Sequence, residues 1–169
     1  MNVTILCDAS YCPQYRVAGY GFWIACQRKR FGGGGAIKSS VDGTNTAEMM
    51  AICNAIWHGV GQKAIEKGDS LLIQSDSLAA IDRLDEKKVV SVTEQQQEVI
   101  TYFREIILKM DFSVKFRHVK GHTAHQEARF VANRMCDKRA KFHMRAARKQ
   151  LVAKPYIEEI KELLREHQP

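Results

Sequence analysis

The feature of this sequence that most restricts its fold is the order of its apolar runs. Some of these runs are short and strand-like, and others have the spacing of a helix. Short strand-like runs lie at 3–8, 19–26 and 31–39, and a run with helical spacing begins at Thr44. After it come a short apolar strand at 70–75, helical stretches from Asp76 and from about Val92, an alternating strand at 112–119 and a helical remainder from about His125. This order predicts an α/β domain whose five-stranded mixed sheet, an antiparallel hairpin followed by parallel strands, is covered by helices on both faces.

The size and composition indicate a globular protein of one main domain. The chain has 169 residues, and no apolar run approaches the roughly 20 residues of a membrane helix. The N-terminus lacks the basic start and long apolar segment of a secretory signal. The five cysteines are scattered without a C-x-x-C pair, which favours free thiols over disulfides or a zinc site. We therefore expect a cytoplasmic protein that does not bind membranes.

Positive charge is concentrated in one part of the chain. The formal net charge is +7, and residues 137–154 contain seven Lys or Arg residues against one Asp. A solvated helix face is one explanation of such a run. A binding surface for a polyanion, most commonly nucleic acid, is the other.

The four consecutive glycines at 32–35 are poor strand material. They lack the GK[ST] sequence that a phosphate-binding loop requires, so nucleotide binding there is not indicated. We expect either a bulge or a close approach of another part of the chain.

Four carboxylates occupy positions where a charge is unexpected. Asp8 ends one buried strand, Asp76 follows another, and Glu48 lies on the inward stripe of the first helix. Asp137 belongs to the helix after the last strand. Each has a structural explanation: a turn, the helix dipole, an N-cap, or a surface pair of Asp137 with Lys141. One shared crevice explains all four together, because strand C-termini and helix N-termini can converge in such a sheet.

Four carboxylates in one crevice would repel one another unless cations lay between them. Mutual repulsion would neutralise the acids or unfold the protein. Oxygen ligands select a hard divalent ion such as Mg²⁺ or Mn²⁺ rather than zinc. Two such ions about 3.5–4 Å apart are a known arrangement for phosphodiester cleavage. The acids therefore predict a metal-dependent nuclease site.

Five short motifs occur in an order that is found in one enzyme family. They are CDAS at 7–10, TNTAE at 44–48, QSDS at 74–77, VKGH at 119–122 and N-x-x-C-D at 133–137. On these motifs, residues 1 to about 145 resemble a type 1 ribonuclease H, the endonuclease that cuts the RNA strand of RNA–DNA hybrids. The resemblance implies a ribonuclease H-like fold, a hybrid substrate and two Mg²⁺ ions per site, for which Mn²⁺ could substitute.

The resemblance also implies a role for each matching acid. Asp8 would bridge both ions, and Asp76 would hold the ion that binds the attacking water. Glu48 and Asp137 would hold the ion at the leaving side. In-line attack on the scissile phosphate would leave a 5′-phosphate and a 3′-hydroxyl. His122 would shuttle protons or assist product release, because an imidazole exchanges protons near neutral pH.

Two further residues would contact the substrate by the same resemblance. Ser10 and Asn45 would read the RNA 2′-hydroxyls, which distinguish RNA from DNA. A plain turn residue and a plain helix cap explain them equally well. His118, at the end of an alternating strand, is interpreted as structural.

The sequence departs from the family pattern at three places. No glycine-rich turn follows CDAS. The TNTAE segment is also tighter than the run that usually precedes the glutamate in this family. Some relatives have a basic, tryptophan-containing extension that binds the hybrid (the handle), whereas this chain has only the short segment 85–91 at that place. We expect the basic helix from Lys138 to Lys154 to replace that handle in part by binding phosphates through Arg145, Arg148 and Lys149.

The end of the chain has no counterpart in the pattern. Residues 1–150 would form the ribonuclease H domain and residues 151–169 a C-terminal helical extension, with a helix break at Pro155. The extension could dock on the domain or on a protein partner.

Two other functions fit part of the sequence. A structure-specific DNA nuclease or junction resolvase could have a related fold and carboxylate site. A non-catalytic module that binds RNA–DNA hybrid could have kept the fold, although a pure binder gains nothing from negative charges placed against a polyanion. Cleavage of matched hybrid, duplex DNA and four-way junctions in Mg²⁺ separates the two nucleases, and tight binding without metal-dependent cutting would indicate the binding module.

Overall fold

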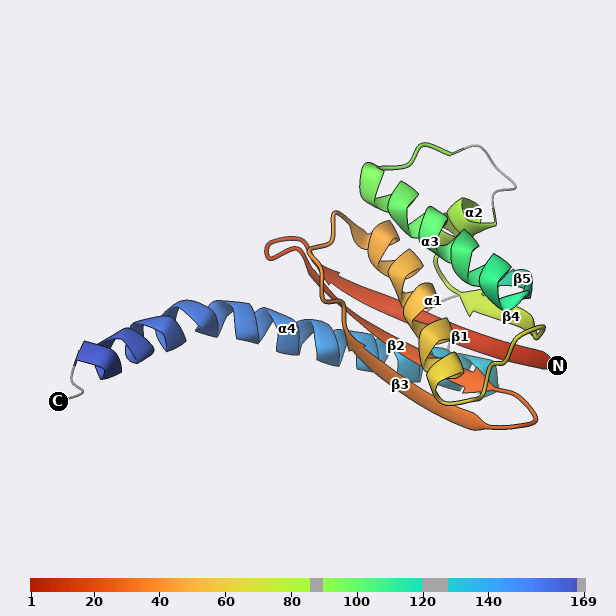
Figure 1. The fold of residues 1–169 in the computed structure, drawn as a ribbon, viewed down its shortest axis with the longest axis horizontal. Helices are drawn as coiled ribbons and strands as arrows, with labels where there is room; N and C mark the ends of the chain where they lie inside the picture. The colour runs from red at the N-terminus through yellow and green to blue at the C-terminus, as the bar shows by residue number, and fades with distance from the viewer. Residues whose placement is uncertain (86–89, 120–127, 167–169) are drawn as a thin grey trace.

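The computed structural model describes residues 1–85, 90–119 and 128–166, and its elements follow the predicted order (Figure 1). They are β1 (Asn2–Cys12), β2 (Val17–Ala25), β3 (Arg30–Ala36), α1 (Thr44–Gly61), β4 (Ser70–Ser75), α2 (Leu78–Leu84), α3 (Glu94–Met110), β5 (Ser113–His118) and α4 (Ala128–Glu166). Ser77 caps α2 and Thr93 caps α3 through their side-chain oxygens. Such caps satisfy amide groups that have no partner within the helix.

The strands form one mixed sheet in the order β3-β2-β1-β4-β5. β1 pairs antiparallel with β2, and β2 antiparallel with β3. β4 joins the other side of β1 in parallel, and β5 continues in parallel from β4. The predicted fold class is therefore confirmed, with β1 at the centre of the sheet.

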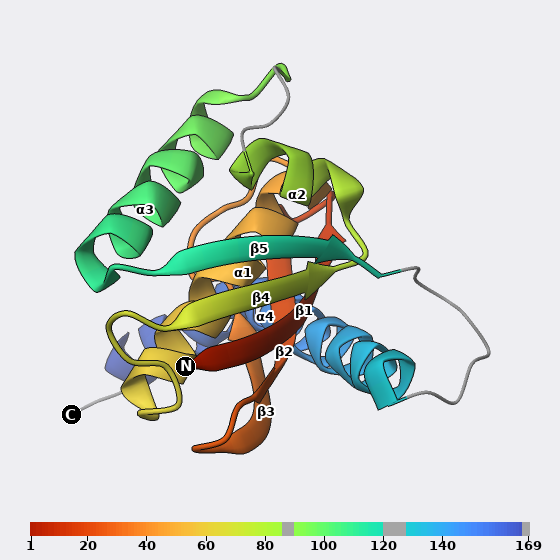
Figure 2. The same ribbon diagram turned by 90° about the vertical axis from the view of Figure 1, so that its right-hand side faces the viewer.

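Helices cover both faces of the sheet, as expected (Figures 1 and 2). Side chains alternate along β2: Phe22 stacks on His58 of α1, whereas a Cβ at Gly21 would touch the Cys136 carbonyl of α4. α1 therefore packs on one face and α4 on the other. The main core lies between α1, α3 and the sheet, and its fully buried side chains include Ile5, Ile52, Ile56 and Ile73.

The glycine run forms a regular strand rather than a bulge. Each glycine from 32 to 35 is paired in an unbroken register with β2. A Cβ at Gly34 would lie 2.4 Å from the Tyr20 carbonyl oxygen and 3.0 Å from the His143 ring of α4. On the opposite face, a Cβ at Gly33 would lie 2.7 Å from the Phe22 ring. The predicted close approach is confirmed, because large side chains and α4 occupy the space where side chains of β3 would stand.

One prediction about the end of the chain is wrong. α4 continues through Pro155 as a single helix from Ala128 to Glu166, without the expected break. A proline removes one helical hydrogen bond, here to the carbonyl of Leu151. Both residues are exposed, so water can bond to that carbonyl and the helix continues. Its C-terminal half projects beyond the sheet (Figure 1).

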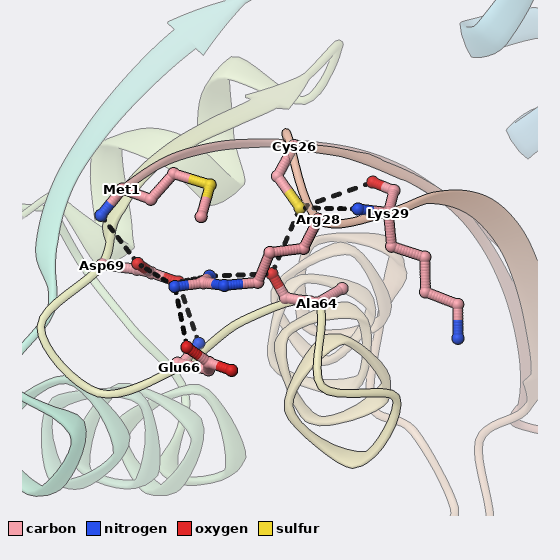
Figure 3. Close-up of polar contacts among 7 residues, drawn as sticks. All are labelled: Met1, Cys26, Arg28, Lys29, Ala64, Glu66 and Asp69. Carbon is pink, nitrogen blue, oxygen red and sulfur yellow. Dashed lines mark hydrogen bonds and ion pairs between the residues drawn. The ribbon is translucent and has the colours of Figure 1, made fainter.

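An ion-pair network around the buried Asp69 links the two chain segments that precede β3 and β4 to the N-terminus (Figure 3). Asp69, which is 1% exposed, accepts bonds from Arg28 Nη1 at 2.5 Å and from the Met1 amino group at 2.8 Å. Arg28 Nη2 also lies 2.8 Å from Glu66 Oε2. Burial opposes ionisation of Asp69, but the bonds from Arg28 and Met1 outweigh it and lower its pKa to about 2.

Within the described ranges, no helix is both long enough and apolar enough to span a membrane.

Candidate active site

Three of the four predicted acids meet where β4 ends, beside β1, which continues past Asp8 to Cys12 instead of ending at Asp8 as predicted. Asp8 lies on β1, Asp76 directly follows β4, and Glu48 lies near the start of α1. One carboxylate oxygen of each lies within 4.8 Å of the other two. The parallel pairing explains the meeting, because Leu6 is opposite Gln74 and each acid comes two residues later in the chain, Asp8 within β1 and Asp76 just past the end of β4.

Asp8 and Glu48 are buried, and the neighbouring acids destabilise their charged forms. Asp8 is 6% exposed and Glu48 is 5% exposed. Burial, followed by the charges of Asp76 and Asp137, raises the pKa of Asp8 to about 7. Burial, followed by Asp8 and Asp76, raises the pKa of Glu48 well above its usual range. The Ala9 amide donates to both carboxylates and lowers both pKa values only in part.

The donor set fits a hard divalent cation. Glu48 Oε2 is buried and has no hydrogen-bond partner in the described part of the chain. A buried acceptor without a donor is costly, and a cation would satisfy it. The set contains carboxylate oxygens from three elements and neither thiolate nor imidazole, which is the chemistry that Mg²⁺ and Mn²⁺ prefer.

Asp137 lies beside this group but has another partner. Its charge contributes to the raised pKa of Asp8, which puts the carboxylate near the cluster. Lys141 Nζ lies 2.8 Å from both Asp137 Oδ1 and Oδ2. This i,i+4 pair is the structural explanation that the sequence allowed, and here it occurs next to the acidic cluster rather than apart from it.

Comparison with known families identifies the chain. The family model of RNase H matches residues 1–148. The chain belongs to the RNase H family. The resemblance drawn from the five motifs is therefore confirmed.

Solved structures of RNase H proteins share the fold at low sequence identity. The N-terminal RNase H domain of rv2228c from Mycobacterium tuberculosis matches with a TM-score of 0.65 and 15% identity, over 89% of this chain and 98% of that one. RNase H1 from the archaeon Halobacterium salinarum matches with a TM-score of 0.65 and 15% identity, over 86% and 99%. LC11-RNase H1 in complex with RNA/DNA hybrid matches with a TM-score of 0.60 and 15% identity, over 82% and 96%. No curated protein matches the sequence.

The other predicted site residues lie in different surroundings. Ser10 stands two residues beyond Asp8 on the same face of β1, and Asn45 lies three residues before Glu48 in the first turn of α1. Both are partly exposed beside the acids. His122 lies outside the described residues. The N-cap of α1 is Gly43, so Asn45 is not the cap. The Gly43 backbone carbonyl accepts a hydrogen bond from the Ala47 amide.

The predicted phosphate-binding residues Arg145, Arg148 and Lys149 are exposed along α4. Arg148 follows Asp137 by 11 residues, about three helical turns, so it lies on the same side of the helix roughly 16 Å away.

A cavity of about 600 Å³ lies between the C-terminal half of α4 and the β1–β2 turn. Arg16, Lys38 and Lys154 contribute its positive charges. Sequence reasoning missed this set because its members come from three distant segments.

Sequence reasoning also missed a contact behind Asp76. His118 Nε2 lies 3.1 Å from the backbone carbonyl oxygen of Asp76. This contact joins the end of β5 to the residue that follows β4, and so helps to position the Asp76 backbone. The interpretation of His118 as structural agrees with it, but nothing in the local sequence identified the partner.

Proposed function

We propose that this RNase H family protein is an endonuclease that hydrolyses the RNA strand of RNA–DNA hybrids and leaves 5′-phosphate and 3′-hydroxyl ends. The observation that carries the proposal is the meeting of Asp8, Glu48 and Asp76 within 4.8 Å in a largely buried position. An acidic cluster of this kind destabilises a protein unless it binds cations. Strong mutual perturbation of titratable groups is also typical of catalytic sites.

The chain's own residues would hold the cations and orient the reacting groups. Asp8 would contact both ions, together with Asp76 at one ion and Glu48 at the other. Asp137 would complete the set once Lys141 releases its carboxylate. When bound, two Mg²⁺ or Mn²⁺ ions would supply charge neutralisation and a water that is nucleophilic near neutral pH. His122 would serve in proton transfer or product release.

Hybrid is the substrate that the surroundings of the site support best. LC11-RNase H1, which shares the fold, was crystallised with RNA/DNA hybrid. Ser10 and Asn45 stand beside the acids, where 2′-hydroxyl groups would mark the RNA strand. The exposed basic side of α4 would bind phosphates and hold the duplex across the acidic cluster.

Cleavage of a labelled hybrid tests the proposal. Wild-type protein should cut the RNA strand with Mg²⁺ and should not cut it in excess chelator. Asp76→Asn keeps the size of the side chain but removes its charge, so cleavage should be nearly lost while the fold is retained. Glu105→Gln is a matched control, because Glu105 is an exposed acid on α3, and it should cut normally.

The same assay decides between the remaining functions. Four-way junctions or duplex DNA cut in preference to hybrid would indicate a resolvase or another DNA nuclease. Tight hybrid binding without metal-dependent cutting would indicate a binding module. Either outcome would overturn the proposed activity.

A further inference from the structure

Two carboxamide side chains lie buried close to the acidic cluster, with oxygens that the polypeptide leaves unsatisfied. Gln74 and Asn133 are each 5% exposed. Gln74 Oε1 and Asn133 Oδ1 have no hydrogen-bond partner within residues 1–85, 90–119 and 128–166. Together with Glu48 Oε2, they are the buried unpartnered side-chain oxygens of these ranges. Buried acceptors of this kind are rare and are usually satisfied by ordered water or an ion.

Gln74 stands two residues before Asp76, on the same side of the sheet. It is paired with Leu6 of β1, which in turn stands two residues before Asp8. Because side chains alternate along a strand, Gln74 faces the side of the sheet that carries both acids. Its carboxamide therefore forms part of the layer beneath the acidic cluster.

Asn133 approaches the same layer from α4. It lies one helical turn before Asp137, so both side chains are on the same side of the helix. The next turn is held on the sheet by Cys136, whose thiol donates to the Leu6 carbonyl oxygen at 3.6 Å. Leu6 is also the strand partner of Gln74. Gln74 and the turn of α4 that follows Asn133 thus both adjoin Leu6, which stands two residues before Asp8.

We infer that Gln74 and Asn133 are positioning residues that hold ordered water beneath the acidic cluster. Their carbonyl oxygens accept hydrogen bonds from this water, whose own oxygen atoms face the cation site. The inference rests on the proposed binding of divalent cations by Asp8 and Asp76. It extends that proposal, because it assigns part of the cation affinity to two neutral side chains outside the acids.

The cation affinity follows from the water layer. Groups that hold the surroundings of a metal ligand typically contribute 10- to 100-fold to metal affinity. Apolar side chains in place of the carboxamides would leave no acceptors for the water. They would remove both the acceptor oxygens and the water bonded to them, so the stability of the metal-free protein should change little.

Calorimetric titration with Mg²⁺ alone, without nucleic acid, tests the inference. Gln74→Met and Asn133→Leu should each weaken Mg²⁺ binding about 10- to 100-fold relative to wild type. Asn54→Leu is the matched control, since the Asn54 amide donates to the Met50 carbonyl within α1, and it should bind Mg²⁺ like wild type. Urea unfolding in chelator should show that both apolar variants remain folded.

Two further measurements test the inference even if one of the apolar variants does not fold. Asn133→Asp keeps an acceptor oxygen at the same place, so it should bind Mg²⁺ at least as tightly as wild type. A crystal structure of the wild-type protein should contain water bonded to both carboxamide oxygens. Unchanged Mg²⁺ affinity in the apolar variants, or carboxamide oxygens bonded to protein donors without water, would overturn the inference.

The outcome is separate from that of the proposed function. A protein that binds Mg²⁺ with the expected dependence on Gln74 and Asn133, but does not cut hybrid, retains the inference and loses the proposed activity. If wild-type protein cuts hybrid but the variants bind Mg²⁺ as tightly as wild type, the proposed activity stands and the inference about Gln74 and Asn133 is lost.

Discussion

Neutralising Asp8 should stabilise the metal-free protein, although it should abolish cleavage. Burial and the neighbouring acids raise the pKa of Asp8 to about 7, from an ordinary value of 3.8. Each pKa unit corresponds to about 1.4 kcal/mol, so ionised Asp8 opposes folding by about 4 kcal/mol at most. The figure is an upper limit because Asp8 and Glu48 share the same repulsion.

The pH dependence has a definite sign. Because the pKa of Asp8 is higher in the folded protein, the stability associated with its neutral form is fully present below about pH 3.8. That stability is lost as the pH rises towards about 7, and above this value the loss is constant. Asp8→Asn removes the titrating group, so its advantage over wild type should grow across this window.

Urea unfolding in chelator measures the effect. At about pH 8.5 the midpoint for Asp8→Asn should exceed that of wild type by the equivalent of up to about 4 kcal/mol, and near pH 4 the two should nearly coincide. Glu105→Gln, which removes an exposed charge, should change the midpoint little. A metal-free Asp8→Asn protein that is no more stable than wild type at the higher pH would refute the reasoning.

Magnesium should narrow the difference in stability between the two proteins. A ligand that binds only the folded state stabilises it by about 2.7 kcal/mol at 100 times its dissociation constant. Wild type should gain this stabilisation, whereas Asp8→Asn, which lacks the central ligand, should gain little. Equal gains would show that Asp8 does not hold the cation.

Three other perturbations test the ion-pair network, the packing of α4 and its basic side. Asp69→Asn should lower the unfolding free energy by about 2 kcal/mol at neutral pH, and in wild type this contribution should disappear as the pH falls towards about 2, as measured by urea unfolding against pH. Gly21→Val should destabilise the protein by about 3 kcal/mol in thermal unfolding, because its Cβ would lie 2.2 Å from the Cys136 carbonyl oxygen and force α4 from the sheet. Removing basic side chains of α4 should reduce the slope of log affinity for hybrid against log salt by about one for each phosphate that the protein no longer binds, and an unchanged slope would exclude phosphate binding by Arg145, Arg148 and Lys149.

The elements of the fold could be predicted because they depend on neighbouring residues. The stripe of Met49, Ile52 and Ile56 is buried as expected, since helical spacing alone places these side chains on one side of α1. The alternation before His118 likewise identified β5. Pro155 misled the prediction, because a proline limits only one hydrogen bond, which solvent can replace at an exposed position.

The acids of the site could be selected, but their distances could not. Asp8 and Asp76 were recognisable because a charge directly or shortly after a run of apolar residues is unusual. Their meeting depends on the parallel register of β1 with β4, which a local pattern does not contain. The Lys141 pair with Asp137 was foreseen as an isolated surface contact, yet only the crossing of α4 over the sheet brings it beside Asp8.

The sequence by itself determined which segments become strands and helices and which of them carry unexpected charge, because periodicity and residue chemistry act over a few neighbouring positions. Only the tertiary structure decided that Gln74 and Asn133 lie beneath the acids and that glycines admit α4 to the sheet. These features depend on strand register and helix crossing. Both arise from packing between residues far apart in the chain, so no local pattern can encode them.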